Sequence, residues 1–172
     1  MLKLLGAVLI VGACSALGLA ARQRLRQRLH ALDAMIAALQ YIASELQCRM
    51  TPLPELIDAL ARSDNDITAR IFRTMRTKIR HEDELSLPYK WCRAFQECRE
   101  TVGLGEEENR LLCDVSGFLG KYDAMQQIKS LDYVRRRLCD LRVSAQEELH
   151  SKGNIYRTCG IALGIVTVLV LL

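Results

Sequence analysis

Residues 25–46, LRQRLHALDAMIAALQYIASEL, decide the fold class of this chain. Apolar residues recur there at alternating steps of four and three, at Leu25, Leu29, Leu32, Ile36, Leu39, Ala43 and Leu46. This spacing places an apolar stripe along one helix, as in helices that pack against a partner helix. A second seam of this kind lies near the other end, at Leu131, Val134, Leu138, Leu141 and Ala145. Together the seams predict two long helices that form the stem of an antiparallel bundle.

Four shorter helices are predicted between the seams, because capping and breaking residues divide the intervening sequence. Thr51 is expected as the N-cap of the first, with a proline at its first helical position, and Asp66 as the N-cap of the second. The third starts at Pro88, has one face formed by Trp91, Phe95, Cys98 and Val102, and ends at Gly103. Three glutamates from Glu106 occupy the first turn of the fourth, where the helix dipole favours them. No stretch has the alternating, aromatic-rich pattern of a strand, so the sequence predicts an all-α domain of about six helices.

Two apolar runs flank this domain, and we expect both to cross a membrane. Residues 4–21 and 158–172 carry no charge. A hydrocarbon core about 30 Å thick needs about 20 helical residues, so the first run is long enough, whereas the second needs Ile155 and Tyr156 as well, with Arg157 reaching toward the headgroups. The predicted organisation is an N-terminal transmembrane helix at 1–21, a six-helix bundle at 22–157 and a C-terminal transmembrane helix at 158–172. The first and last helices of this membrane-anchored bundle would continue into the membrane spans.

A cleaved signal peptide is the alternative interpretation of the first run, because VGAC at 11–14 resembles a lipoprotein cleavage box. The apolar run continues past Cys14, however, and then meets arginines at positions 22, 24, 26 and 28. All Lys and Arg residues except Lys3 lie between Arg22 and Arg157, and basic flanks stay on the cytoplasmic side. We therefore expect residues 22–157 in the cytoplasm, with the four arginines facing an anionic leaflet at about 1 kcal/mol of attraction each.

Cysteine and histidine spacing argues against a disulfide framework and against a metal centre. The seven cysteines are odd in number and form no CxxC pair, and none of the three histidines stands near a cysteine at ligand spacing. The acidic clusters at Asp64, Asp66 and residues 82–84 suit capping and loop solvation better than the metal-binding acids of helical prenyl-transfer enzymes. We therefore expect no metal, no cofactor and no catalytic residues.

Residues 116–127, SGFLGKYDAMQQ, raise the question of a phosphate-binding loop. A Walker loop needs four residues between its glycines and a Ser or Thr after the lysine, whereas here two residues separate Gly117 from Gly120 and a tyrosine follows the lysine. The stretch is better explained as a corner between helices. Gly120 would adopt the left-handed conformation, Asp123 would cap the next helix, and Gln126 would complete a capping box.

This corner belongs to a set of motifs that resembles the stage III sporulation protein AB family of endospore-forming bacteria. The others are MLKLLGAVLIV at 1–11, a glutamate at 45 followed by TPLPEL at 51–56, and the glycine-containing apolar C-terminus, so the resemblance spans the chain. Its most specific element is the pattern LGxxDxxxQ, formed by Leu119, Gly120, Asp123 and Gln127. Gly153 and Asn154 depart from the family pattern and predict a weak point in the last helix.

The resemblance implies a fold similar to the cytoplasmic six-helix domain of type II secretion platform proteins. It also implies a place beside a cytoplasmic secretion-type ATPase, in the complex that joins mother cell and forespore. On that basis the expected function is a non-enzymatic membrane platform or adaptor in the mother-cell membrane facing the forespore. Its partners would be membrane lipids, other membrane subunits and the ATPase. The alternative is a two-span signal-transducing bundle, although the chain leaves at most a few residues outside for a sensor.

Two basic stretches are candidates for partner binding. Arg70, Arg73 and Arg80 lie on one helix that also carries an Ile67, Ile71, Met75 and Ile79 stripe, and Arg135, Arg136 and Arg137 are consecutive. A solvated face, a protein-docking surface and membrane contact all remain open for them. Nucleic acid is disfavoured because aromatic residues are not interleaved and acidic residues nearly balance the basic ones. Within the membrane, Gly160 and Gly164 have the spacing that lets helices pack closely, including those of a second copy of the chain.

Overall fold

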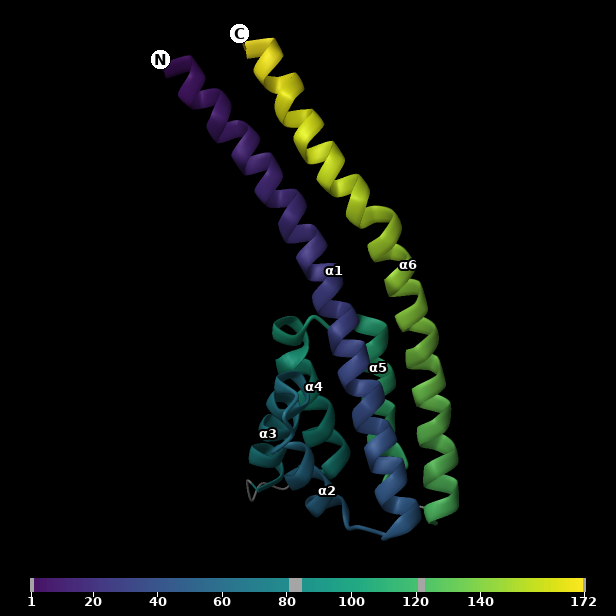
Figure 1. The fold of residues 1–172 in the computed structure, drawn as a ribbon. Coiled ribbons are helices and arrows are strands. Elements are labelled where there is room, and N and C mark those ends of the chain that lie inside the picture. The colour runs from purple at the N-terminus through teal and green to yellow at the C-terminus, as the bar shows by residue number, and fades with distance from the viewer. Residues whose placement is uncertain (1, 81–84, 121–122, 172) are drawn as a thin grey trace. The chain divides into compact units, whose positions relative to one another are not determined.

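The computed structural model describes the backbone of residues 2–80, 85–120 and 123–171, and their side chains except at 2–15, 17, 18 and 152–171. Six α-helices and one 3₁₀ turn form the secondary structure of these residues, and no strand occurs among them. The elements, shown in Figure 1, are α1 (Leu2–Cys48), α2 (Leu53–Leu60), α3 (Asp66–Arg80), α4 (Leu87–Val102), α5 (Glu106–Asp114), the turn η1 (Val115–Gly117) and α6 (Ala124–Leu171). The predicted all-α class with two long and four short helices is confirmed.

The chain is organised in two structural units. Residues 30–142 form one, and residues 1–29 together with 143–172 form the other. Both boundaries fall inside the long helices α1 and α6, so each of these helices belongs partly to each unit. The division predicted from the sequence, at residues 22 and 157, stays a prediction.

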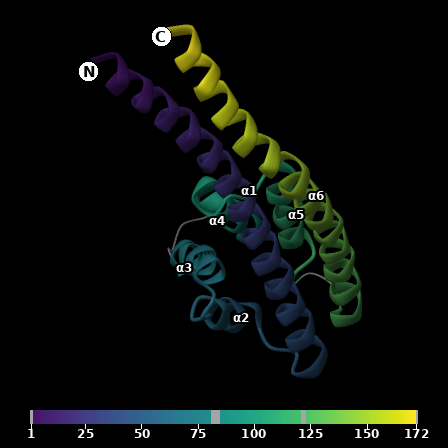
Figure 2. The same ribbon diagram turned by 45° about the horizontal axis from the view of Figure 1, so that its top comes forward.

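Within residues 30–142, the second half of α1 has α2, α3 and α4 on one side and α5 and α6 on the other (Figures 1 and 2). Its buried residues there are Ala31, Leu32, Ala34, Met35, Ala38, Leu39 and Ile42. Of the predicted stripe, Leu32 and Leu39 are buried, whereas Ile36 and Ala43 are only half-buried. The predicted seam on α1 is therefore confirmed only in part, because a helix with neighbours on two sides buries a broader face. On α6 the prediction holds better, with Leu131, Val134, Leu138 and Ala145 buried.

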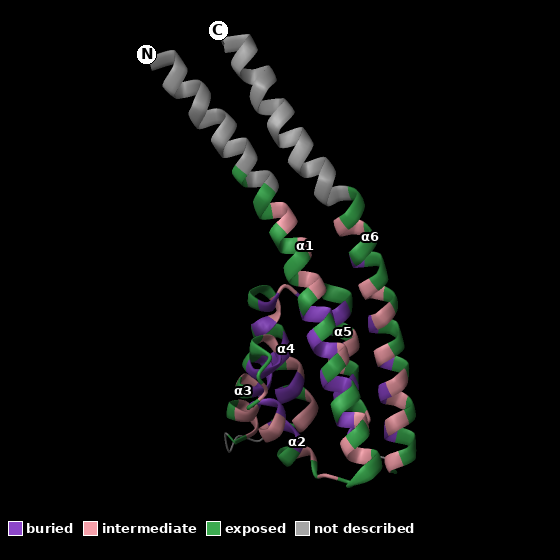
Figure 3. Cartoon of the chain, in the orientation of Figure 1, coloured by how far each residue is buried: buried purple, intermediate pink, exposed green. Residues whose placement is uncertain are grey.

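An aromatic cluster forms the core between α3 and α4. Phe72 on α3 meets Trp91 and Phe95 on α4 edge to face, with ring centroids 6.0 and 6.4 Å apart. The indole Nε1 of Trp91 donates a hydrogen bond to the carbonyl oxygen of Leu112 at 2.8 Å, which joins α4 to α5. Such ring pairs add to the burial of large apolar surfaces. The predicted face of α4 is confirmed in full, and buried positions recur along α3 and α4 in Figure 3.

The starts of α2 and α3 differ in detail from the predicted caps. Thr51 does not cap α2, because its hydroxyl donates to Glu45 Oε2 at 2.9 Å and so fastens the α1–α2 connection. Asp66 is the first residue of α3 rather than its cap, and the Oδ1 of Asn65 accepts from the backbone N–H of Thr68 at 3.1 Å. At the start of α3 the prediction chose the wrong one of two adjacent polar residues, since either side chain has the required acceptor. The N-cap of α2 is Pro52, and no described side chain caps this helix.

The ends of α4 and α5 follow the sequence more closely. Gly103 adopts the left-handed conformation with φ of 82° and ends α4, as predicted. Three glutamates occupy the first turn of α5, also as predicted. A backbone conformation that only glycine adopts easily is therefore easier to predict from the sequence than a side-chain cap.

The apolar terminal runs belong to the outer parts of α1 and α6. Helix α6 continues through Gly153 and Asn154, where the sequence predicts a weak point, and the strength of the helix there stays a prediction. No helix is long and apolar enough to cross a membrane among the residues whose side chains the structure describes. Except for residues 16 and 19–21, the predicted spans at 1–21 and 158–172 lie outside these side chains, and so do Gly160 and Gly164.

Candidate functional site

The first candidate surface, the basic face of α3, is engaged in contacts with its own fold. The guanidinium of Arg70 lies 3.1 Å from Asp66 Oδ2, one helical turn away. Arg73 donates from Nε to the carbonyl oxygen of Ala61 at 3.0 Å, where α2 ends. Because the last carbonyls of a helix lack partners within that helix, Arg73 satisfies an acceptor that would otherwise be left without a donor.

Other cations of α3 are held by acids on neighbouring helices. Asp58 on α2 lies 3.9 Å from Arg76 and 3.4 Å from Arg80. Lys78 Nζ lies 2.7 Å from the carboxylate of Glu97 on α4. Each of these pairs is partly solvent-exposed and therefore contributes little to stability by itself. Their combined effect is to lower the positive potential that α3 presents to a partner.

The second candidate surface, Arg135–Arg137 on α6, is also paired. Arg135 and Arg136 both donate to Asp132, at distances of 2.5 and 2.8 Å. The hydrogen bonds from Arg135 first, and then from Arg136, hold the pKa of the Asp132 carboxyl below its ordinary value. Arg137 lies 3.6 Å from Glu107 on α5. The two arginine sets are on separate helices with α1 between them, so they do not form one continuous surface (Figures 1 and 2).

The corner before α6 brings together most residues of the LGxxDxxxQ motif. Gly120 has a φ of 75°, as predicted, and the preceding Leu119 is buried. The N–H of Gly120 donates to the side-chain oxygen of Gln127 at 3.1 Å, and the carbonyl of Asp123 accepts from the backbone N–H of Gln127 at 3.0 Å. Buried Gln127 thus ties the corner to the first turn of α6.

The predicted capping box at this corner was wrong in its choice of glutamine. Gln126 is exposed, and the Asp123 carboxylate makes no hydrogen bond within the part of the chain that the structure describes. A capping box spans three residues, whereas the observed bond from Gly120 to Gln127 spans seven. The LGxxDxxxQ pattern did include the correct glutamine, because it ends at Gln127 rather than Gln126.

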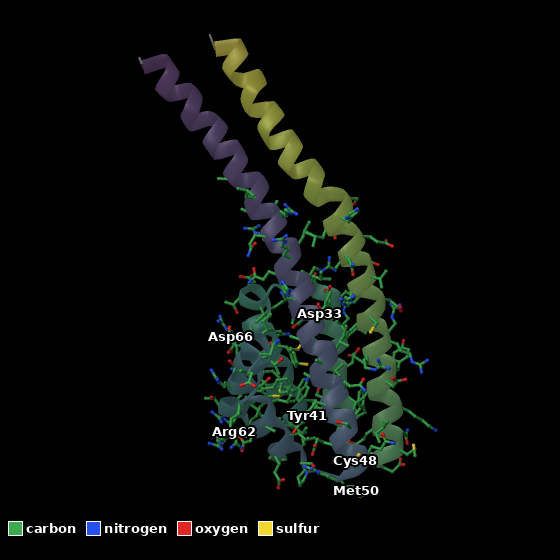
Figure 4. The ribbon with its side chains drawn as sticks, viewed as in Figure 1. Asp33, Tyr41, Cys48, Met50, Arg62 and Asp66 are labelled. Carbon is green, nitrogen blue, oxygen red and sulfur yellow. The ribbon has the colours of Figure 1, made fainter. Side chains whose placement is uncertain are left out.

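Two surface grooves were not anticipated from the sequence. One, of about 360 Å³, lies between α1 and the α2–α3 connection and is lined by Tyr41 and Arg62, which Figure 4 labels. A larger one, of about 760 Å³, lies between the stretches 22–29 of α1 and 143–151 of α6, both in the same unit. Arg22 and Arg26 line it. Grooves between helices distant in sequence leave no local pattern that a sequence analysis could detect.

A cluster of side chains able to hold a metal ion is not found in the described residues. No three His, Cys, Asp or Glu side chains there come close enough to bind a metal ion, and residues 82–84 of the acidic cluster lie outside the described part. Burial, and next a hydrogen bond with Cys92, raise the pKa of the Cys113 thiol to about 12. This thiol stays protonated at neutral pH, and the thiolate is the reactive form of cysteine.

Comparison with known proteins relates nearly the whole chain to one family. The family model for stage III sporulation protein AB matches residues 3–172. Stage III sporulation protein AB of Bacillus subtilis (strain 168) is 23% identical over 172 residues, which is the full length of both chains. A solved structure of a stage III sporulation protein AB superposes with a TM-score of 0.63 at 20% identity, over 72% of this chain and 96% of that one.

The structural match supports the helical fold, and the match to the family model extends the relationship to nearly every residue. A protein of this family has a role associated with sporulation. The chain therefore belongs to the stage III sporulation protein AB family.

Proposed function

We propose that the protein is a membrane platform or adaptor without enzymatic activity, in a secretion-like complex between mother cell and forespore. Residues 1–21 and 158–172 anchor it in the mother-cell membrane, and the helical domain between them lies in the cytoplasm. There it couples a cytoplasmic ATPase to the membrane subunits of the complex. The ATPase and the complex come from the resemblance to the stage III sporulation protein AB family, whereas membrane insertion follows from the two uncharged terminal runs.

The observation that carries this proposal is the continuity of α1 and α6. These helices contain 47 and 48 residues, so each is about 70 Å long at 1.5 Å per residue. Each begins or ends in an uncharged apolar run and supplies buried residues to the unit formed by residues 30–142. A change imposed on that unit by a partner would reach the membrane along uninterrupted helices, which is what an adaptor requires.

Because the basic side chains contact other groups of the fold, the variants that test ATPase docking are chosen to leave the fold intact. Reversing Arg73 would remove its bond to the Ala61 carbonyl and disturb the fold, so it is left unchanged. R70E/R80E alters α3, and R136E/R137E alters α6. Both double variants change the charge equally, so each serves as the control for the other. Loss of ATPase recovery from one variant alone, at matched expression, would identify the docking surface.

Cross-linking in sporulating cells tests the adaptor function directly. A photo-reactive residue replaces Thr77 on α3 or Tyr133 on α6, both of which are exposed, in otherwise unchanged full-length protein. Capture of a cytoplasmic ATPase from at least one position is the expected result. Capture of neither the ATPase nor a membrane subunit of the complex, from cells that accumulate the protein, would contradict the proposal.

Reporter fusions test membrane anchoring separately. A reporter active only in the cytoplasm should be inactive at either terminus and active when inserted at 82–84, between α3 and α4. Activity at the C-terminus would mean that residues 158–172 do not cross the membrane.

A further inference from the structure

We infer that the groove between residues 22–29 of α1 and 143–151 of α6 binds the phosphate headgroup of an anionic phospholipid. The groove is formed entirely within one structural unit and has a volume of about 760 Å³. This volume is within the range of small-molecule sites, roughly 300–1,000 Å³. The inference rests on the proposed membrane anchoring, because it needs the terminal apolar runs to place the groove at the bilayer surface.

The first support is the lack of hydrogen-bond partners, among the described residues, at the two arginines in the groove. The Nε of Arg22 is buried and has no hydrogen-bond partner, and Arg26 makes no hydrogen bond or ion pair with any described residue. All six arginines of the candidate docking surfaces, in contrast, contact an acid or a carbonyl of their own chain. A buried donor without an acceptor is costly, and a ligand oxygen would supply the missing acceptor.

The second support is the chemistry and spacing of these side chains. Arg22 and Arg26 are four residues apart, so they lie on the same face of α1 about 6 Å apart along the helix axis. Guanidinium groups bind phosphate oxygens through paired N–H donors, which favours a phosphate over a simple halide. Leu29 and Leu149 also line the groove, and their apolar surface strengthens charge interactions nearby by excluding water.

The third support is the position of the groove along the chain. Arg22 immediately follows the uncharged run that ends at Ala21. If Ala21 marks the edge of the hydrocarbon core, Arg22 falls within the headgroup layer, which is about 5–7 Å thick on each side of a bilayer, and Arg26, about 7.5 Å from Ala21 along the helix, lies at its outer edge. Basic pockets between helices on the cytoplasmic side are known sites for anionic headgroups. A lipid phosphate therefore reaches the two guanidinium groups from the membrane itself.

Replacing Glu147 should change lipid binding in the opposite direction to replacing Arg22 or Arg26. Its carboxylate lines the same groove and makes no ion pair with any described residue. It repels a bound phosphate, so E147Q should strengthen lipid binding whereas R22Q and R26Q should weaken it. Arg24 is the matched control, because it is exposed on the same turn of α1 but does not line the groove.

The experiment uses the full chain in phosphatidylcholine nanodiscs with trace spin-labelled phosphatidylglycerol or phosphatidylcholine. Electron paramagnetic resonance gives the relative affinity of the protein for each label. At 1 M salt, screening over about 3 Å suppresses diffuse attraction to Arg24. We expect R22Q and R26Q each to lower the preference for phosphatidylglycerol by about fivefold, R24Q to leave it unchanged and E147Q to raise it.

The outcomes separate this inference from the proposed function. Equal losses in R24Q and R26Q, or no preference in the parent protein, would overturn the headgroup site while leaving membrane anchoring intact. Failure of the chain to enter nanodiscs would contradict the anchoring and the site together. Displacement of the labelled lipid by millimolar inorganic phosphate would assign the groove to free phosphate and overturn the lipid as its occupant.

Discussion

The arginines of the candidate docking surfaces and those of the groove differ in their surroundings. In residues 30–142, arginines on α3 and α6 contact acids or carbonyls of the same unit, and Arg142 pairs with Asp33, which Figure 4 labels on α1. In the other unit Arg28 pairs with Glu148 at 3.3 Å, but Arg22 and Arg26 pair with no described residue. Abundant positive charge is therefore a poor guide to a binding surface. The informative cations are those that the fold leaves without acceptors.

The largest effect should follow from breaking the core of residues 30–142. Trp91→Ala removes a buried ring and its hydrogen bond to the Leu112 carbonyl, so we expect a loss of about 3–5 kcal/mol in the free energy of unfolding. Denaturant unfolding of the full chain in detergent, followed by circular dichroism, measures it. The variant lacks the only tryptophan, so fluorescence cannot serve. A loss below 1 kcal/mol would mean that the aromatic cluster does not organise the unit.

The corner at Gly120 should show the next largest effect. Gly120 has a φ of 75°, so Gly120→Ala should cost about 1–2 kcal/mol, although nothing lies within 4 Å to obstruct the added methyl group. Gly117→Ala is the matched control, because that site is equally open and has no positive φ. The same unfolding measurement applies to both variants. Equal costs at the two positions would contradict the assignment of the corner to backbone conformation.

Arg73 should behave differently from its neighbour Arg70. Arg73→Gln removes the donor to the Ala61 carbonyl and should destabilise the protein by about 1 kcal/mol. Arg70→Gln breaks only an exposed pair with Asp66 and should change stability by less than about 0.5 kcal/mol. Thermal unfolding of both variants under one condition checks the difference. If Arg70→Gln proved the more damaging, the division into structural and solvated arginines would fail.

The smallest effect concerns pH and Asp132. Its pKa is lowered in the folded protein, so folding favours the ionised carboxylate. The stabilisation is therefore present above its ordinary pKa of 3.8 and is lost as pH falls through the lower folded value. Asp132→Asn should slightly reduce the loss of stability below pH 4. The unfolding midpoint temperature, recorded as a function of pH, measures this loss. An unchanged profile would show that the forked contact with Arg135 and Arg136 is not maintained in solution.

The sequence predicted elements well where a single residue type or a local period determines the structure. The left-handed glycines at 103 and 120, the apolar face of α4 and the seam on α6 follow from such local signals. It failed where two adjacent residues offer the same chemistry, as with Asn65 and Asp66 or Gln126 and Gln127, because the choice depends on small differences in backbone direction. The broader buried face of α1 also required knowledge of its neighbours.

The candidate surfaces show a further limit of the sequence. The contacts of Arg73 with Ala61 and of Arg28 with Glu148 join residues 12 and 120 positions apart. No local pattern indicates which arginines will find such acceptors, because the partners meet only in the folded chain. The groove between residues 22–29 and 143–151 could not be predicted for the same reason.

One measurement tests the contrast between paired and unpaired arginines most directly. Two full-length variants, R22Q/R26Q and R136Q/R137Q, are compared in nanodiscs with spin-labelled phosphatidylglycerol at 1 M salt. Each variant lacks two positive charges. R22Q/R26Q should lose most of the preference for phosphatidylglycerol over phosphatidylcholine, whereas R136Q/R137Q, whose native arginines contact Asp132 and Glu107, should keep it. Equal preference in the two variants would contradict the assignment of the unpaired arginines to the lipid headgroup.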